Sequence, residues 1–216
     1  MEKKILNVCI VLIIGLMVLS GCASHTALTK ENRATLKAVS VNKDVPKPDL
    51  IGVHGMKETN IEFAGFLTGG IVGTAAASEI PKKRGPLLKY VMEKSGIDIS
   101  EIVREKFIAQ LKNSGFPCSI TEEGGDAEFK LSIFGIGFSK PPGFTDNLRP
   151  WLYVDAILVK PDGAILWKDR EIVQNPSQTP SRKFNEYINN PELIREALSI
   201  VSQIVSEKLV KDLACK

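Results

Sequence analysis

The amino terminus constrains this 216-residue chain more than any other stretch, because its first 22 residues divide into three parts of distinct composition. Residues 1–4 carry two lysines and one glutamate. Residues 5–19 form an almost unbroken apolar run, and Ser20 and Gly21 then precede Cys22. A charged start, an apolar middle and small residues before a cleavage point are the parts of a secretory signal peptide. The run is short for a transmembrane helix, which needs about 20 apolar residues.

The sequence Leu19-Ser20-Gly21-Cys22 resembles the lipobox of bacterial lipoproteins. The resemblance implies that the Cys22 thiol receives a diacylglycerol, that the signal is cut just before it, and that the new amino terminus is acylated. Several acyl chains give stable membrane anchoring. In diderm bacteria an Asp after the lipidated Cys favours the inner membrane; Ala23 stands here, which implies an outer-membrane protein facing the periplasm. The alternative is an uncleaved membrane helix with an incidental cysteine.

Length and charge limit the mature protein to one domain without a nucleic-acid partner. The chain has a net charge of +3, of which residues 1–21 account for +1, so +2 remains without a clustered basic face. About 195 residues are enough for one domain with a substantial core. We therefore expect a signal peptide over 1–21, a flexible polar tether over 22–34, and a single periplasmic domain over 35–216.

Two further cysteines remain after Cys9 leaves with the signal and Cys22 is lipidated, namely Cys118 and Cys215. The periplasm is oxidising, so these two can form a disulfide. The alternative is two free thiols, because two cysteines alone do not fix the required geometry.

Residues 61–80 are apolar and rich in small side chains. Gly65, Gly69, Gly73 and Ala77 recur every four residues, which on a helix makes one smooth stripe where another backbone can approach closely. Relative to alanine, each glycine destabilises an isolated helix by about 1 kcal/mol. Three interpretations stay open: a helix buried in the domain or in a homo-oligomer, a helix at the membrane, or a Gly/Ala loop.

The rest of the chain alternates between strand and helix patterns. We expect a first strand over 35–41, an edge strand or extended loop over 49–54, a short helix from Pro86, and a stronger helix over 100–113 that Asp98 or Ser100 caps. Strands follow over 127–138, 151–159 and 164–173, and a long helix covers 191–213 with a buried stripe of Ile194, Leu198, Val201, Val205 and Leu209. Apolar alternation changes phase near Gly135, which predicts a β-bulge there.

This order predicts an α+β fold, with helices packed on one face of a mainly antiparallel sheet. The layout loosely resembles the periplasmic domains of envelope-assembly lipoproteins, such as activators of penicillin-binding proteins and the curli secretion lipoprotein. It is more similar to uncharacterised bacterial lipoproteins with a Gly-rich apolar insert before the first strong helix. The motifs at 154–159 and 161–167 are those of a hairpin, so the resemblance implies a fold and carries over no functional residue.

The sequence offers little for catalysis. His25 and His54 are its only histidines, and it contains no paired-histidine metal spacing, phosphate-binding glycine loop or nucleophile elbow. We therefore predict no catalytic residue, metal or cofactor. Trp151, Tyr153 and Trp167 are predicted to form a cross-strand aromatic group, either as core packing or as a partner-binding patch.

The predicted function is that of a lipid-anchored, non-catalytic interaction or assembly module of the cell envelope. Its partners would be membrane lipid, through acylated Cys22, and another envelope protein or a second copy of the chain. The alternative is a membrane-active or self-associating lipoprotein that uses the stripe of Gly65, Gly69, Gly73 and Ala77.

Overall fold

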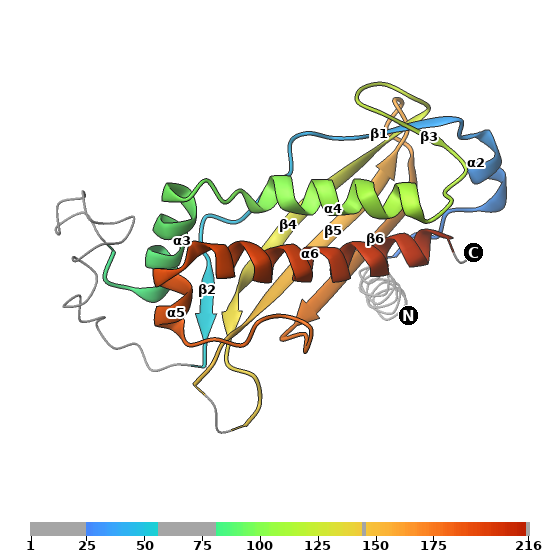
Figure 1. Cartoon of the computed structure of the whole chain (residues 1–216). Helices are drawn as coiled ribbons and strands as arrows, with labels where there is room; N and C mark the ends of the chain where they lie inside the picture. Colours follow the sequence, from blue (N-terminus) through green and yellow to red (C-terminus); the bar gives the residue numbers. More distant parts are fainter. Residues whose placement is uncertain (1–24, 56–80, 144–145, 215–216) are drawn as a thin grey trace, which may run out of the picture.

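The computed structural model describes residues 25–55, 81–143 and 146–214 (Figure 1). Along the chain it contains α2 (Lys30–Thr35), β1 (Ala38–Val41), β2 (Gly52–His54), α3 (Arg84–Lys94), α4 (Ile99–Asn113), β3 (Ser119–Thr121), β4 (Ala127–Ser139), β5 (Arg149–Val159), β6 (Ile165–Gln174), α5 (Phe184–Asn189) and α6 (Pro191–Ala214). Within these ranges, none of the helices combines the length and the apolar character that a membrane span needs.

The strands form one mixed sheet in the order β3-β1-β4-β5-β6, and β2 pairs with β4 beyond the end of β1. β4, β5 and β6 are antiparallel neighbours joined by short connections. β1 is parallel to both β3 and β4, and β2 is parallel to β4. The prediction of an α+β fold is confirmed, whereas the prediction of a mainly antiparallel sheet is wrong. Parallel pairs need a long crossover, and α3 and α4 lie in that crossover between β2 and β4.

The bulge predicted at Gly135 is present in β4. The register against β5 shifts between Ile133 and Gly135, so one extra residue, Phe134, enters the strand. Ile133, Ile136 and Phe138 are all buried. The insertion therefore keeps the apolar side chains of both halves of β4 on the same side of the sheet.

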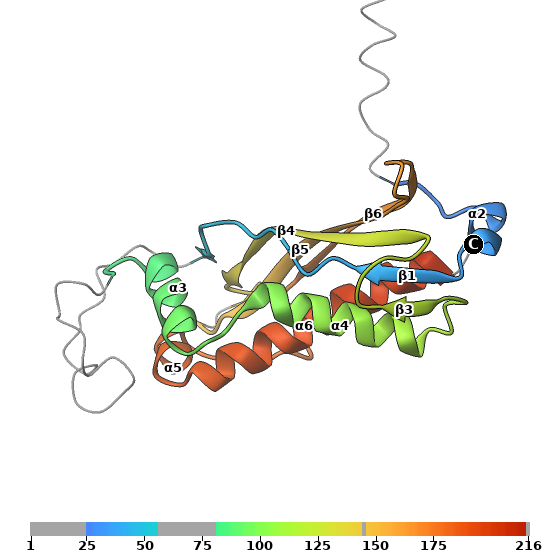
Figure 2. The ribbon, with the colours of Figure 1, turned by 90° about the horizontal axis from the view of Figure 1, so that it is seen from above.

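The two long helices α4 and α6 cover one face of the sheet, as predicted (Figures 1 and 2). The predicted stripe of α6 is buried throughout, and α4 buries Ile99, Val103, Phe107 and Leu111. The Phe107 ring meets the Phe129 ring of β4 edge-on at 5.2 Å between centroids. Trp167 of β6 meets the same ring at 6.0 Å. This apolar layer between helices and sheet is the core of the domain.

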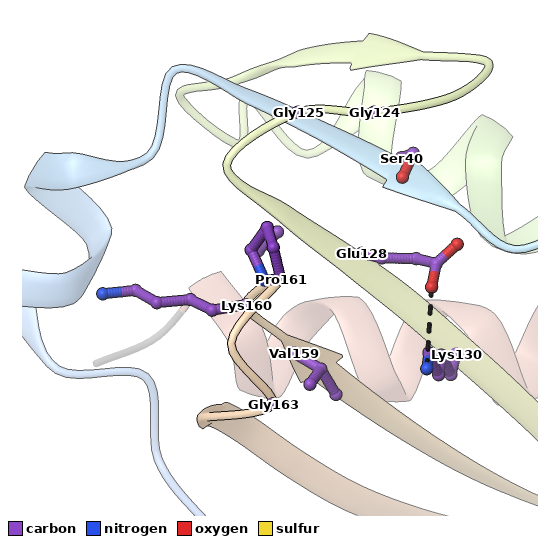
Figure 3. A pocket seen from close by; sticks show the side chains of 10 residues that line it. Ser40, Gly124, Gly125, Glu128, Lys130, Val159, Lys160, Pro161 and Gly163 are labelled. Atoms are coloured by element: carbon purple, nitrogen blue, oxygen red, sulfur yellow. Dashed lines mark ion pairs between the residues drawn. The ribbon is translucent and has the colours of Figure 1, made fainter.

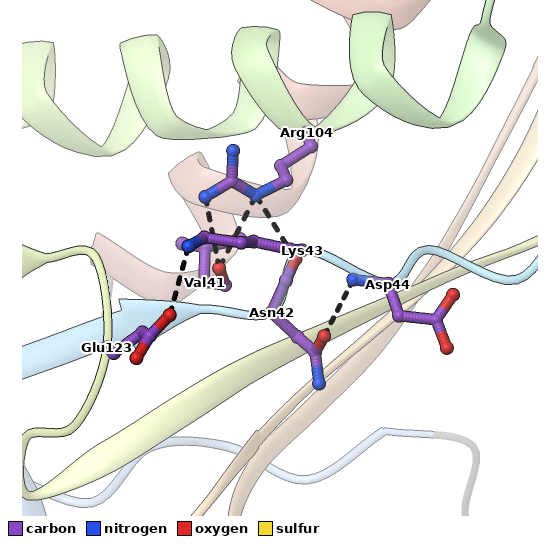
Figure 4. Close-up of polar contacts among 6 residues, drawn as sticks. All are labelled: Val41, Asn42, Lys43, Asp44, Arg104 and Glu123. Atoms are coloured by element: carbon purple, nitrogen blue, oxygen red, sulfur yellow. Dashed lines mark hydrogen bonds and ion pairs between the residues drawn. The ribbon is translucent and has the colours of Figure 1, made fainter.

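Polar contacts fix the start of α4 against the preceding chain. The Asp98 carboxylate caps the helix by accepting from the Ser100 amide at 2.9 Å. The Lys47 ammonium group also donates to Asp98, at 2.7 Å, and this hydrogen bond is the largest cause of the lowered pKa of Asp98. The Arg104 guanidinium donates to the carbonyl groups of Val41 and Asn42, which ties the helix to the end of β1 (Figure 4).

Residues 25–35 pack on the domain and so differ from the flexible tether that we expected over 22–34. Thr26 exchanges two backbone hydrogen bonds with Lys168 of β6, at 2.8 and 2.9 Å. Leu28 is 2% exposed, and α2 follows, with the Thr29 side chain accepting from the Asn32 amide. A single backbone bridge and a single buried leucine produce no repeating apolar pattern in the sequence. The packing of this segment could therefore not be predicted from such a pattern.

Replacing Phe107 by alanine tests the core directly. Phe107 is fully buried between α4 and the sheet, so Phe107→Ala should lower the free energy of unfolding by about 3–5 kcal/mol. Urea unfolding measures this change. Glu105→Ala, at an exposed position of the same helix, should stay within about 0.5 kcal/mol of the unchanged protein. Equal midpoints for the two variants would contradict the described packing.

Candidate functional site

The face of the sheet opposite α4 and α6 carries a cluster of aromatic side chains. Alternate residues of a strand point to opposite faces, so Trp151 and Tyr153 of β5 lie on the face away from the buried Leu152 and Val154. Figure 2 shows both long helices on one side of the strands. Among the described residues, no helix covers the face that bears Trp151 and Tyr153.

Four rings form this cluster, which we call the aromatic platform: His54, Phe134, Trp151 and Tyr153. The Trp151 and Tyr153 rings lie 4.9 Å apart between centroids. Phe134 lies 5.4 Å from Tyr153, and His54 stacks on Trp151 at 5.6 Å with an angle of 24° between the planes. Rings at these separations attract one another beyond simple area burial.

Trp167 does not belong to the platform, and the predicted group of Trp151, Tyr153 and Trp167 is wrong in that member. Trp167 pairs in register with the buried Leu158 and is itself fully buried against Phe129. The register of β6 against β5 decides which face a residue occupies, and the sequence alone did not fix that register.

Three glycines make room for the Trp151 ring. A β-carbon on Gly52, Gly135 or Gly137 would lie 2.6–2.9 Å from atoms of that ring. The indole therefore lies close against the backbone of β2 and β4, and Trp151 is 9% exposed. Its Nε1 atom is buried and has no hydrogen-bond acceptor among the described residues.

Polar side chains border the platform on β5 and β6. Arg170 makes a two-pronged ion pair with Asp155, at 2.5 and 2.7 Å, and its guanidinium carbon lies 4.3 Å from the centre of the Phe134 ring. Hydrogen bonding to Asp155 raises the pKa of Arg170. Gln174 donates to the hydroxyl group of Tyr153. These contacts hold the Phe134 and Tyr153 rings in place.

Two large apolar side chains of this region stay in contact with water. Phe134 is 40% exposed, and Ile172, which pairs in register with Tyr153, is 49% exposed. The bulge is what places Phe134 on this face, next to Gly135, which pairs in register with Tyr153. Exposed apolar residues gathered in one place, with a polar border, are typical of a binding surface. The chemistry that the platform can supply is apolar contact, ring stacking and cation–π contact.

A separate hollow of about 360 Å³ lies at the opposite end of β4, between β1 and the turn that joins β5 to β6 (Figure 3). Glu128 and Lys130 form an ion pair there at 3.8 Å. Ser40 is the only hydroxyl-bearing residue of its lining, which contains neither histidine nor cysteine as far as the chain is described. The lining therefore offers neither a serine–histidine nor a cysteine–histidine pair, the common arrangements that activate a nucleophile.

Most site residues singled out in the sequence lie outside the described residues: Cys22, Gly65, Gly69, Gly73, Ala77 and Cys215. Cys118 is half-buried, its sulfur lies 3.3 Å from the Leu36 carbonyl oxygen, and burial raises the pKa of its thiol. The Leu213 carbonyl accepts a hydrogen bond from Arg33. The positive charge of Arg33 partly offsets the rise in the pKa of the Cys118 thiol. The disulfide between Cys118 and Cys215 stays a prediction.

Comparison with known proteins gives no family. No family model matches the chain, and no curated protein matches it. Among solved structures, the chain is similar to a Xanthomonas campestris protein of the DUF330 family, at 10% identity and a TM-score of 0.42 over 81% of each chain. It is similar to the PelC dodecamer protein of Paraburkholderia phytofirmans, at 14% identity and a TM-score of 0.36 over 89% of this chain and 94% of that one. A Caulobacter crescentus protein assigned as a lipoprotein matches at 15% identity and a TM-score of 0.38 over 54% and 80%.

Gly137→Ala tests the close approach of Trp151 to the backbone. The added carbon would lie 2.0 Å from the Gly52 carbonyl oxygen and 2.6 Å from the Trp151 ring. Because the nearest neighbour is backbone, we expect a loss of about 3 kcal/mol in the free energy of unfolding, together with a changed tryptophan signal in near-ultraviolet circular dichroism. Ser132→Ala, on the same face of β4, should leave both unchanged. An unaltered tryptophan signal in Gly137→Ala would contradict the described packing.

Proposed function

We propose that the protein is a lipid-anchored, non-catalytic module of the cell envelope, and that it docks another envelope protein through the aromatic platform. One observation carries the proposal: aromatic rings gather on the sheet face that the described helices leave uncovered, where Phe134 is 40% and Ile172 49% exposed.

The composition of the platform supports a protein partner. Binding energy at protein interfaces concentrates in a few Trp, Tyr and Arg residues, and aromatic residues are enriched at interface centres. Trp151, Tyr153 and Arg170 stand together here, and Phe134 adds exposed apolar area. The contacts that Arg170 makes with Asp155 and Phe134 already fix its geometry, so docking would order few side chains and lose little conformational entropy.

An acyl chain on Cys22 would hold the domain near a membrane. The lipobox-like sequence ending at Cys22 supports acylation at that residue. Residue 25 already lies against the domain, because the Thr26–Lys168 bridge follows directly. Three residues of extended chain span at most about 11 Å, so an acylated Cys22 would hold the domain close to the bilayer. The partner we propose therefore lies at, or reaches, the membrane surface.

Truncating a ring of the platform should sharply reduce recovery of the partner. In crosslinked envelopes, Phe134→Ala and Tyr153→Ala should each reduce the recovered partner by about tenfold or more, the effect expected of interface hot spots. The matched control is Ile165→Ala. Ile165 is apolar and about as exposed as Ile172. It lies on the same strand, about 23 Å from Ile172. Mass spectrometry of the crosslinked products measures recovery.

Equal recovery of the partner with the platform variants and with the control would contradict the docking proposal. The crosslinked products could instead be homo-oligomers of this chain. Homo-oligomers that are lost in a Gly69→Leu, Gly73→Leu double variant but kept in Tyr153→Ala would favour self-association through residues 65–77.

Replacing the acylated residue tests the anchor. Cys22→Ser should appear in the soluble fraction after cell disruption, because no acyl chain then attaches to the chain. Membrane fractionation beside the unchanged protein measures this, with mass spectrometry to establish that the signal has been removed. A variant that is cleaved yet remains with the membrane would show that another segment holds it there.

A further inference from the structure

Three potential metal ligands from distant parts of the chain converge at the edge of the sheet. His25 precedes the bridge to β6, Asp169 belongs to β6, and Asp212 lies in the last turns of α6. His25 Nδ1 lies 3.5 Å from Asp169 Oδ1 and 3.7 Å from Asp212 Oδ2. One ligand atom from each of the three residues lies within 4.8 Å of the other two.

From this convergence we propose that His25, Asp169 and Asp212 form a zinc site, which goes beyond the docking function and does not depend on it. Zinc bonds to imidazole nitrogen and carboxylate oxygen are about 2.0–2.2 Å long, which puts ligand atoms of a tetrahedral site about 3.4 Å apart. The two nitrogen–oxygen separations match this value within a few tenths of an ångström. Three protein ligands leave the fourth position to water.

The donor set decides between classes of cation. Magnesium and calcium prefer oxygen ligands alone, whereas an imidazole nitrogen suits zinc and its transition-metal neighbours. His25 is 39% exposed on its side chain, and Asp169 and Asp212 are 15% and 27% exposed, so a cation from solution can reach the site.

The surroundings also hold the ligands in position. Trp167 Nε1 donates to Asp212 Oδ2 at 3.3 Å, and partners of this kind orient metal-binding carboxylates. Thr26 and Lys168 exchange backbone hydrogen bonds, and this places His25 beside Asp169. Bound zinc would join the start of the described chain to both β6 and the end of α6. It would thereby pin the segment that follows Cys22 to one end of the domain.

Zinc binding by the full-length protein, purified in detergent and stripped of metal, tests this inference. Calorimetry and elemental analysis should find one zinc ion per chain after the cysteines are alkylated. His25→Gln and Asp169→Asn should each weaken zinc binding by about 100-fold or more. Even residues that only hydrogen-bond to a metal ligand contribute about 10–100-fold to metal affinity. The matched control is His54→Gln, which removes the other histidine and should bind as tightly as the unchanged protein.

A second readout follows the segment that the zinc would hold. Zinc should slow tryptic cleavage after Lys30, which is exposed in α2, in the unchanged protein and in His54→Gln but not in His25→Gln. Circular dichroism establishes that each variant folds. Zinc that binds equally to His25→Gln, that disappears on alkylation, or that a tenfold excess of magnesium displaces would overturn the proposal. Because the assay uses purified protein, loss of zinc binding would leave the docking and anchoring proposals standing.

Discussion

Burial of one sheet face under α4 and α6 is the constraint on which the rest of the domain depends. Each strand of the β4-β5-β6 meander sends every second side chain into that layer, where Phe107, Phe129 and Trp167 meet edge to face. The intervening side chains must then point to the other face. The place of Trp151 and Tyr153 is thus a consequence of the packing of Leu152 and Val154.

The bulge in β4 interrupts this alternation and shapes the outer face of the sheet. An extra residue in one strand lets Ile133 and Ile136 both stay inside, and it leaves Phe134 and Gly135 together on the outer face. Phe134 supplies a ring, and the neighbouring glycine leaves space for another ring, that of Trp151. One insertion therefore serves both the core and the platform, which accounts for a bulge in the middle of the longest strand.

Local patterns in the sequence predicted the helices α3, α4 and α6, the hairpin, the stripe of α6 and the bulge at Gly135, because each of these depends on neighbours in the chain. The short helices α2 and α5 were not predicted. The parallel pairing of β1 with β4 was missed, since it depends on a long crossover that leaves no periodic signal. The place of Trp167 was missed for a related reason, because only the register between strands assigns it to the core. His54 and His25 looked isolated in the sequence, yet folding brings one onto Trp151 and the other beside Asp169. Contacts between residues so far apart could not be predicted from spacing.

Photo-crosslinking in living cells tests the central claim, that the platform is a docking surface. A photoreactive amino acid in place of Ile172 stands beside Tyr153, and the same group in place of Ile165 stands on the same strand outside the platform. Our account predicts a discrete crosslinked product with another envelope protein from position 172 and none from position 165. No product from position 172, or the same product from both positions, would contradict it.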